Sequence, residues 1–218
     1  MNIRKLIKVL KTGALPSIAF LVQILFPGCG SDSGGKASKD VGDNNPDLVA
    51  CIGDSITQGY ACVGAPYPER LAAMSGKAVL NFGSTGAKSE QGTSVIGSVV
   101  QRKPGYVCIL YGSNDAIMSV PPDVTQQHIQ YIISVCKANQ CVPIVATPPK
   151  MILDHAGYDP AAAATAEAVR QAAKNGNATL IDLYKAFGNG EKYLNPDDGL
   201  HLSDEGGDFI AKKFNSKL

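Results

Sequence analysis

From residue 47 onward, short apolar runs alternate with longer amphipathic segments. The apolar runs predict strands at residues 48–52, 78–82, 106–111, 142–147 and 179–183, and the segments between them predict helices at 67–75, 90–101, 123–138, 160–175 and 203–216. The third and fourth runs lack polar alternation, which is typical of strands covered on both faces. Strand and helix in repeated succession predict an α/β fold, in which a five-stranded parallel sheet forms the middle of a three-layer α/β/α sandwich.

The segment before residue 47 differs in composition. Residues 31–46 are rich in Gly, Ser, Asp and Asn, and Val41 is their one branched apolar residue. Such a segment cannot bury enough apolar surface to order itself, so a flexible linker is predicted over residues 29–46. One folded domain is expected over residues 47–218, because a chain of 218 residues is long enough for one substantial core and short for two.

The first 28 residues have the pattern of a secretory signal. They contain no acidic residue, and an apolar run over residues 14–27 follows four basic residues, Arg4, Lys5, Lys8 and Lys11. That run is shorter than the ~20 residues that a membrane-spanning helix requires, which favours cleavage over a permanent anchor. A signal peptide over residues 1–28 is therefore predicted.

Cys29 follows the predicted signal directly. A small residue, Gly28, before a cysteine, with a polar linker after it, resembles a bacterial lipoprotein signal, although Phe26 and Pro27 depart from the residues usual there. Lipidation of Cys29 is predicted, with simple secretion as the alternative. We expect an exported bacterial protein, periplasmic or held as a lipoprotein of the cell envelope, which contacts the membrane through this lipid if Cys29 is modified.

The charge balance changes once the signal is set aside. The chain has 20 Lys and Arg residues against 19 Asp and Glu. Four of the basic residues belong to the predicted signal, which leaves 16 against 19, a formal charge of −3. No basic excess is left to bind nucleic acid, so no nucleic-acid partner is expected.

Five cysteines follow Cys29, and export permits disulfides among them. Cys136 and Cys141 bracket four residues at the end of a predicted helix and favour a local disulfide, because a zinc site would require a second pair or nearby histidines. Cys108 lies inside an apolar run and is interpreted as a buried thiol. The pattern does not decide whether Cys51 and Cys62 pair.

The first apolar run leads directly into a glycine-flanked serine, in the stretch VACIGDSITQGY (49–60). Gly53 breaks the strand pattern, and Asp54, Ser55 and Thr57 offer turn and helix-capping chemistry before Gly59. A residue just past the carboxyl end of a parallel strand lies where open α/β sheets hold their ligands. Ser55 is therefore a candidate nucleophile, although Gly-Asp-Ser is also ordinary turn composition.

Three later stretches are equally distinctive: NFGSTGAKS (81–89), YGSND (111–115) and DGLH (198–201). Together with the Gly-Asp-Ser stretch, and in this order, they resemble the SGNH hydrolases, also called the GDSL esterase/lipase family, in which Ser, Gly, Asn and His are each carried by one block. The nearest likeness is to the bacterial periplasmic thioesterase/lysophospholipase type. The resemblance covers nearly all of the chain after residue 47 and implies a flavodoxin-like SGNH hydrolase fold. Ile56 stands where the family often has Leu.

A serine nucleophile requires an imidazole base, and the chain has three histidines. His128 lies in a predicted helix and is interpreted as a solvated surface residue, whereas His155 follows the fourth predicted strand and can line a pocket. His201 comes three residues after Asp198, a spacing that lets carboxylate and imidazole point the same way but that also suits a plain turn. The resemblance assigns Asp198 to orienting His201 and His201 to general base and then general acid. Asp197 is the alternative carboxylate.

Acyl transfer also requires hydrogen-bond donors for the developing oxyanion. The resemblance supplies three: the backbone N–H groups of Ser55 and Gly86 and the side-chain amide of Asn114. Gly86 aligns with the second block better than Gly83, which is the alternative. Asp115 is a candidate partner for the Asn114 amide, because a buried amide must have its own groups satisfied.

These observations predict a secreted serine esterase that hydrolyses carboxylic esters, lysophospholipid or thioester substrates among them, through an acyl-enzyme. The expected partner is a small ester or lipid-like substrate, and no metal or other cofactor is expected. An acetyltransferase or a deacetylase acting on acetylated glycans would use the same residues. A catalytically silent binding protein is a further alternative.

Overall fold

The computed structural model describes residues 39–218. The predicted signal peptide (1–28), Cys29 with its predicted lipidation and the first part of the predicted linker lie outside the described residues. The elements below therefore concern residues 39–218 alone.

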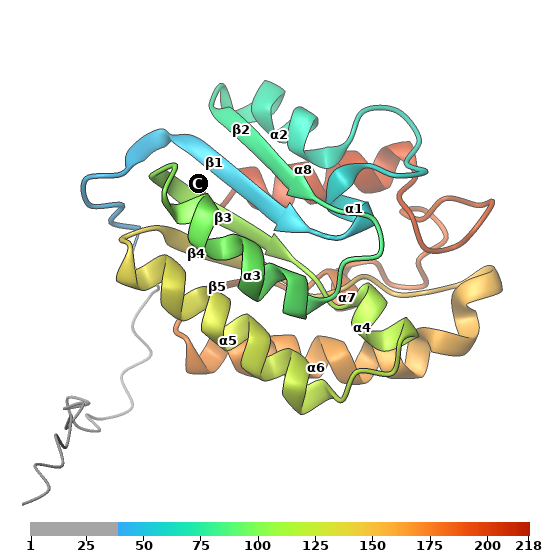
Figure 1. Ribbon diagram of the computed structural model, residues 1–218. Helices are drawn as coiled ribbons and strands as arrows, with labels where there is room; N and C mark the ends of the chain where they lie inside the picture. Colours follow the sequence, from blue (N-terminus) through green and yellow to red (C-terminus); the bar gives the residue numbers. More distant parts are fainter. Residues whose placement is uncertain (1–38) are drawn as a thin grey trace, which may run out of the picture. The chain divides into compact units, whose positions relative to one another are not determined.

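A five-stranded parallel sheet forms the middle of the described structure (Figure 1). Its strands lie in the order β2-β1-β3-β4-β5. This is the flavodoxin-like order, in which the chain reverses direction across the sheet between β1 and β3. The strands are β1 (Asn45–Gly53), β2 (Ala78–Gly83), β3 (Pro104–Leu110), β4 (Val142–Ala146) and β5 (Thr179–Ile181).

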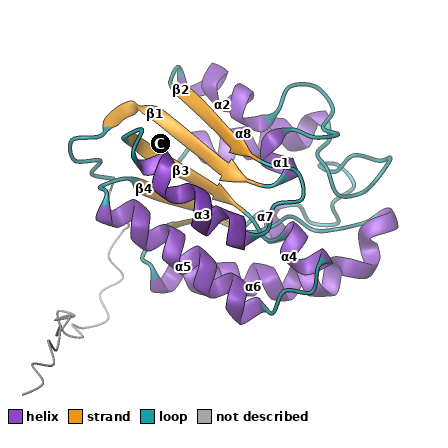
Figure 2. Cartoon of the chain, viewed as in Figure 1, coloured by secondary structure: helices purple, strands orange, loops and turns teal. Residues whose placement is uncertain are grey.

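Helices cover both faces of the sheet (Figure 2). One face packs against α2 (Tyr67–Ser75), α7 (Leu183–Ala186) and α8 (Asp204–Asn215), and the other against α3 (Ser89–Val100), α5 (Pro122–Ala138) and α6 (Asp159–Asn175). Three short elements lie after strands at the carboxyl edge: α1 (Ser55–Gln58), α4 (Ser113–Ile117) and the 3₁₀ helix η2 (Leu153–Tyr158).

The alternation of side chains along each strand divides the core into two halves. Along β3, Cys108 and Leu110 pack with Tyr67 and Phe214 on one face, whereas Val107 and Ile109 belong to the other. Both faces are therefore buried, which explains the unbroken apolar runs in the sequence. The predicted three-layer α/β/α sandwich is confirmed.

The largest departure from the predicted elements is at the start of the sheet. β1 begins at Asn45, inside the segment predicted as linker, and Asn45 pairs with Pro104 at the start of β3. The side chain of Asn44 donates from Nδ2 to the carbonyl of Asn139, 2.8 Å away. The residues just before Asp47 are thus ordered by backbone pairing and polar contacts. The pattern of apolar residues in the sequence does not predict such contacts.

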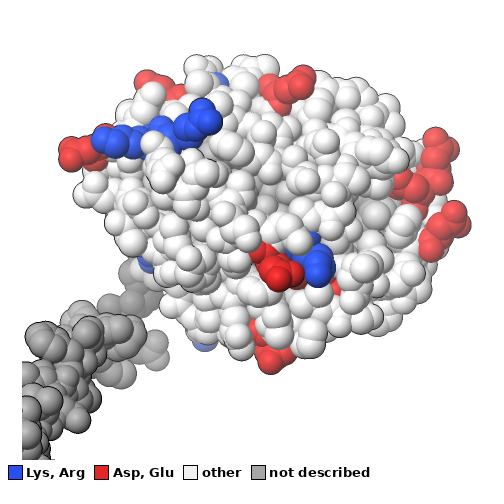
Figure 3. Space-filling view, in the orientation of Figure 1, with Lys and Arg blue, Asp and Glu red and all other residues white. Residues whose placement is uncertain are grey.

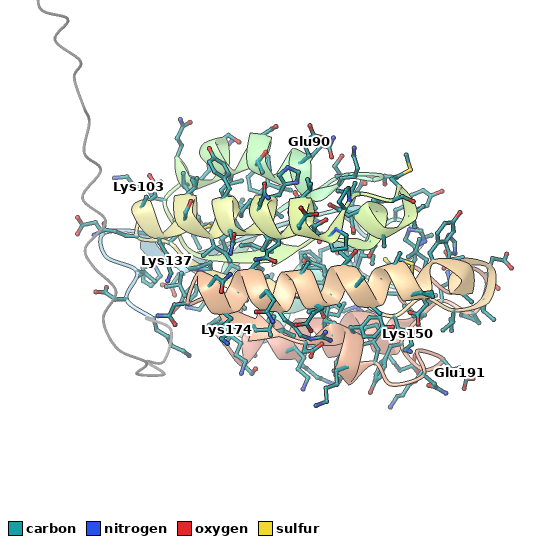
Figure 4. All side chains as sticks on the ribbon, turned by 90° about the horizontal axis from the view of Figure 1, so that it is seen from below. Glu90, Lys103, Lys137, Lys150, Lys174 and Glu191 are labelled. Carbon is teal, nitrogen blue, oxygen red and sulfur yellow. The ribbon has the colours of Figure 1, made fainter. Side chains whose placement is uncertain are left out.

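The helices α5 and α6 lie side by side along one outer layer (Figure 4). Lys137, near the end of α5, donates from Nζ to the carbonyls of Gly176 and Asn177, just past the end of α6. The two helices therefore end together at the amino edge of the sheet. In the face seen in Figure 3, charged side chains of both signs are scattered among uncharged ones. None of the helices between residues 39 and 218 has the length and apolar character needed to span a bilayer.

The cysteines correct one prediction. Cys136 and Cys141 are both free thiols, so the structure contradicts the predicted disulfide. Both thiols are buried in the same half of the core, and the Cys141 thiol lies 3.6 Å from the carbonyl of Asn139, in the turn after α5. Cys108 is a buried thiol, as predicted, and it faces Cys51 across neighbouring strands.

Candidate active site

Ser55 is the first residue after a tight passage from β1 into α1. Gly53 ends the strand, and a Cβ there would lie 2.0 Å from Thr57 Oγ1 and 2.4 Å from the carbonyl oxygen of Leu110, so only glycine fits. Asp54 caps the helix, because its Oδ1 accepts the N–H of Ile56 at 2.9 Å. The passage holds Ser55 at the carboxyl edge of the middle of the sheet, as predicted for the nucleophile position.

Ser55, His201 and Asp198 form a continuous chain of hydrogen bonds. His201 Nδ1 lies 2.7 Å from Asp198 Oδ2, and His201 Nε2 lies 3.1 Å from Ser55 Oγ. An ionised carboxylate can only accept, so the Nδ1 of His201 carries the proton and its Nε2 is the acceptor for the Ser55 hydroxyl. This is the arrangement in which a neutral imidazole can remove the serine proton.

Asp198 is held in its charged form. Partial burial by itself would raise the pKa of this carboxyl, but hydrogen bonds from the backbone N–H of Leu200 and from the ring and backbone N–H of His201 outweigh it. The pKa of Asp198 therefore lies below its ordinary value. The carboxylate that pairs with His201 Nδ1 is that of Asp198 and not that of Asp197, the alternative in the sequence. The backbone N–H of Asp197 donates to Asn195 Oδ1.

The turn that carries Asp198 is fastened to the loop after β4. The carbonyl of Gly199 accepts the N–H of Ile152 at 3.0 Å, and the ring of His155 lies with Nδ1 2.8 Å from the carbonyl of Asp198. A carbonyl only accepts, so Nδ1 of His155 is the donor. His155 thus contacts the backbone beside the candidate site and not Ser55.

Gly86 and Asn114 lie at the ends of the two strands that flank β1. The loop after β2 is joined to β1 by a bond from Ser84 N–H to the carbonyl of Gly53, at 3.1 Å. Asn114 donates from Nδ2 to the carbonyl of Ala87 at 3.0 Å. A primary amide has two N–H groups, so one orients Asn114 on the loop and the second stays free for a ligand.

Two interpretations of this region need correction. The carboxylate of Asp115 does not hold the Asn114 amide: it accepts the backbone N–H and the hydroxyl of Ser89 and the hydroxyl of Thr125. His128 is half-buried and lies with Nδ1 2.9 Å from Ser89 Oγ, so it is not a solvated surface residue. The sequence did not predict a role for Ser89 in this region, because a serine at the start of a helix is typical of an ordinary helix cap.

Asp54 is a buried acid beside the candidate nucleophile. Its side chain has 0% exposure, and burial raises the pKa of Asp54 from 3.8 to about 7, with a further increase from the charge of Asp115 and an opposing effect of the Ile56 N–H. Its Oδ2 is buried without a hydrogen-bond partner. The neutral acid is therefore the form that this environment favours.

Exposed apolar side chains gather in segments at the carboxyl edge of the sheet, the edge that carries Ser55. Among residues 39–218, most large hydrophobic side chains that reach solvent belong to segments after β1, β3 and β4, at the carboxyl edge: Tyr60, Val63, Met118, Leu153 and Tyr158. The Tyr60 ring meets the His201 ring edge-on, with centroids 5.2 Å apart. A cavity of about 300 Å³ lies at the other end of the strands, by Val142 and Asn177, away from Ser55. Within the same residues, no cluster of three or more His, Cys, Asp or Glu side chains is arranged to hold a metal ion.

Comparison with known proteins agrees with this arrangement. Residues 51–208 match the GDSL-like Lipase/Acylhydrolase family. The thioesterase 1/protease 1/lysophospholipase L1 of Escherichia coli K12 is 27% identical over 174 residues, which cover 76% of this chain and 80% of that protein.

Two solved structures are similar in fold. A G-D-S-L family protein from Desulfitobacterium hafniense DCB-2 has a TM-score of 0.69 and 27% identity, over 79% of this chain and 99% of that one. A lipase/acylhydrolase from Enterococcus faecalis has a TM-score of 0.65 and 25% identity, over 78% of this chain and 96% of that one. The similarity in each case spans nearly the whole of the solved chain.

Proposed function

Because the chain belongs to the GDSL-like lipase/acylhydrolase family, we propose that it hydrolyses carboxylic esters through an acyl-enzyme formed on Ser55. One observation carries the proposal: the bond between Ser55 Oγ and His201 Nε2 joins side chains 146 residues apart in the sequence. The bond has the polarity that general-base catalysis requires, because Asp198 fixes the proton of His201 on the opposite ring nitrogen.

In the first half of the reaction, Ser55 Oγ attacks the carbonyl carbon of the ester while its proton passes to His201 Nε2. The new Oγ–C bond gives a tetrahedral oxyanion. His201 then gives the proton to the leaving alcohol or thiol as the bond to that group breaks. In the second half, water attacks the acyl carbon while one of its protons passes to His201 Nε2. His201 then gives that proton to Ser55 Oγ as the Oγ–C bond breaks and the carboxylic acid leaves. Asp198 stays ionised throughout and stabilises the imidazolium.

The oxyanion would lie among three donors: the backbone N–H of Ser55, the backbone N–H of Gly86 and the free amide N–H of Asn114. Ser55 is the first residue of α1, so its N–H has no partner within the helix. Removal of one such donor commonly lowers the rate by about 10²- to 10³-fold. The Asn114 amide is the donor that a single substitution can remove.

The substrate class proposed is an ester or thioester with an apolar acyl chain, lysophospholipids included. Two observations support it. Large apolar side chains are exposed in the segments at the carboxyl edge of the sheet, notably Tyr60, Met118 and Leu153, and the E. coli relative is named a thioesterase and lysophospholipase. Acyl group and leaving group can be assigned with esters and thioesters of increasing chain length, and product analysis with a sugar acceptor separates hydrolysis from acyl transfer.

Replacement of Ser55 by alanine tests the nucleophile. Ser55→Ala should lower kcat for a short p-nitrophenyl ester by about 10⁴-fold or more, because the acyl-enzyme can no longer form. Ser98→Ala is the matched control, since Ser98 is an exposed serine on α3 whose hydroxyl only contacts the carbonyl of Val95. Turnover by Ser55→Ala at the rate of the control variant would refute the mechanism.

We further propose that the protein is exported and anchored through lipid on Cys29. The support is the sequence pattern of residues 1–29 alone. Mass spectrometry of the mature N-terminus should find a diacylglyceryl-modified Cys29. An unmodified N-terminus at any other residue would exclude the anchor without affecting the catalytic proposal.

A further inference from the structure

A second group of Ser, His and Asp side chains lies beside Asn114, where the start of α3 and α4 meet the first half of α5. Asp115, with 0% exposure, accepts the backbone N–H of Ser89 at Oδ2 (2.9 Å) and the Ser89 hydroxyl at Oδ1 (2.5 Å). Thr125 donates to the same Oδ1 at 3.0 Å, and His128 Nδ1 lies 2.9 Å from Ser89 Oγ. A cavity of about 280 Å³ borders Asp115 and His128.

The proton count shows that this group is not a second catalytic triad. The Ser89 hydroxyl has one hydrogen, and the short contact with the carboxylate takes it. His128 must therefore donate from Nδ1 to Ser89 Oγ, so its nitrogen facing the serine is not a free base. In the Ser55 site the imidazole separates carboxylate from serine, whereas here the serine separates imidazole from carboxylate. Ser89 is thus held in place and is not activated.

What the group does connect is the two segments that carry the candidate oxyanion donors. Asn114 and Asp115 are neighbours in α4; Asn114 contacts the stretch between β2 and α3, and Asp115 contacts the first residue of α3. Asn114 binds the carbonyl of Ala87, and Asp115 binds Ser89 through its backbone and its side chain. Gly86 comes directly before the first of these points, at φ +76° and with open space where a Cβ would be, so no side chain of its own fixes its N–H.

We propose that Asp115, acting through Ser89, is a positioning residue that sets the N–H of Gly86 relative to the side-chain amide of Asn114. This rests on the proposed esterase function, and it adds to that function a residue that touches neither substrate nor Ser55. Oxyanion donors act only when they lie about 3 Å from the developing charge. A loop with a glycine at its tip requires anchoring on both sides to hold such a distance. Ser84, bound to Gly53, anchors it on the β1 side. Ser89 anchors it on the other side, because both its N–H and its hydroxyl donate to Asp115.

Three substitutions separate positioning from general stability. Ser89→Ala and Asp115→Asn both weaken the link to the loop. Thr125→Val is the matched control, because it removes a buried hydrogen bond to the same carboxylate oxygen but from α5, which carries no oxyanion donor. Each is assayed for kcat and KM with a p-nitrophenyl ester, for the pH profile of kcat/KM and for Tm.

We expect Ser89→Ala and Asp115→Asn to lower kcat by about 10- to 100-fold, part of the effect of losing one oxyanion donor, with KM within about twofold. The acidic limb of the pH profile should not move, since His201 and Asp198 are untouched. Thr125→Val should keep kcat within about twofold even where its Tm falls as far as that of Ser89→Ala.

Full kcat in Ser89→Ala, or equal losses of kcat in all three variants at matched Tm, would overturn the positioning role. These outcomes are distinguishable from a failure of the proposed function, because Ser55→Ala reports on that function separately. Inactive Ser55→Ala together with fully active Ser89→Ala would reject only the positioning role of Asp115. If Asp115→Asn does not fold, Ser89→Ala alone carries the test, because it removes the hydroxyl bond through which Asp115 is proposed to act and leaves the carboxylate with its bonds to the Ser89 backbone N–H and to Thr125.

Discussion

Replacement of Asp54 by asparagine should change the pH dependence of stability in a defined direction. Asp54 is completely buried, and its pKa is raised from 3.8 to about 7, chiefly by burial and additionally by the charge of Asp115. Tyr111 and Tyr67 also lie within electrostatic reach of this carboxyl. Asparagine keeps the oxygen that accepts the Ile56 N–H but cannot ionise, so the variant isolates the titration from the helix cap.

The sign follows from proton linkage. Between pH 3.8 and about 7 the folded protein keeps a proton on Asp54 that the unfolded chain has lost. The folded state binds more protons there, so the Asp54 contribution to the free energy of unfolding falls as pH rises. A shift of about 3 pKa units at about 1.4 kcal/mol per unit corresponds to roughly 4 kcal/mol. The full loss is reached above pH 7.

Urea denaturation of both proteins at intervals from pH 4 to pH 8.5 gives the free energies of unfolding. Relative to Asp54→Asn, the unsubstituted protein should lose roughly 4 kcal/mol across this range. Asp123→Asn, which removes an exposed carboxyl at the start of α5, controls for the change in net charge. A difference between the unsubstituted protein and Asp54→Asn that stays constant from pH 4 to pH 8.5 would refute the reasoning.

The remaining predictions concern the turn that carries the candidate base. Asp198→Asn should lower kcat by about 10⁴-fold with little change in KM, because an amide can present N–H to His201 and favour the wrong tautomer; steady-state kinetics showing a loss below about tenfold would contradict the role of this carboxylate. Gly199→Ala should lower both Tm and kcat, because Gly199 has φ +69° and a Cβ there would lie 2.2 Å from the carbonyl oxygen of Ile152, and the left-handed conformation alone costs an L-residue about 1–2 kcal/mol. Gly188→Ala is its control, with φ +61° and open space around the Cβ position, and a Tm for Gly199→Ala no lower than that of this control would show that the close approach to Ile152 does not matter.

The pattern of apolar residues along the sequence was sufficient to predict the strands and the long helices. Each buried strand is a run without polar alternation, and each outer helix is long enough to show an amphipathic face. The elements α1, α4 and α7 were not predicted, because four or five residues do not complete two turns of a helix and so display no period. The start of β1 was also not predicted, since Asn45 and Asp47 are polar and Asn45 pairs with Pro104 before the apolar pattern begins.

The site was predictable where chemistry coincides with a strand end. Ser55, Gly86 and Asn114 follow β1, β2 and β3, and parallel strands bring their carboxyl ends to one edge. That Asp198 and His201 meet Ser55 came from the resemblance, and the structure brings the three side chains together. The hydrogen bond between Ser89 and Asp115 could not be predicted, because the two residues are 26 positions apart and no periodic pattern of residue types indicates such a contact. The predicted disulfide between Cys136 and Cys141 was wrong because a disulfide requires a specific geometry that spacing in the sequence does not supply.

The central claim is that the Ser55 hydroxyl is made nucleophilic by His201. A fluorophosphonate probe tests it directly, because the probe forms a bond to an activated serine oxygen with loss of fluoride. Peptide mass spectrometry after labelling should locate one adduct, on Ser55, and labelling should be abolished in Ser55→Ala and strongly slowed in His201→Ala. An adduct on another serine, or equal labelling of Ser55 with and without the imidazole, would contradict the account.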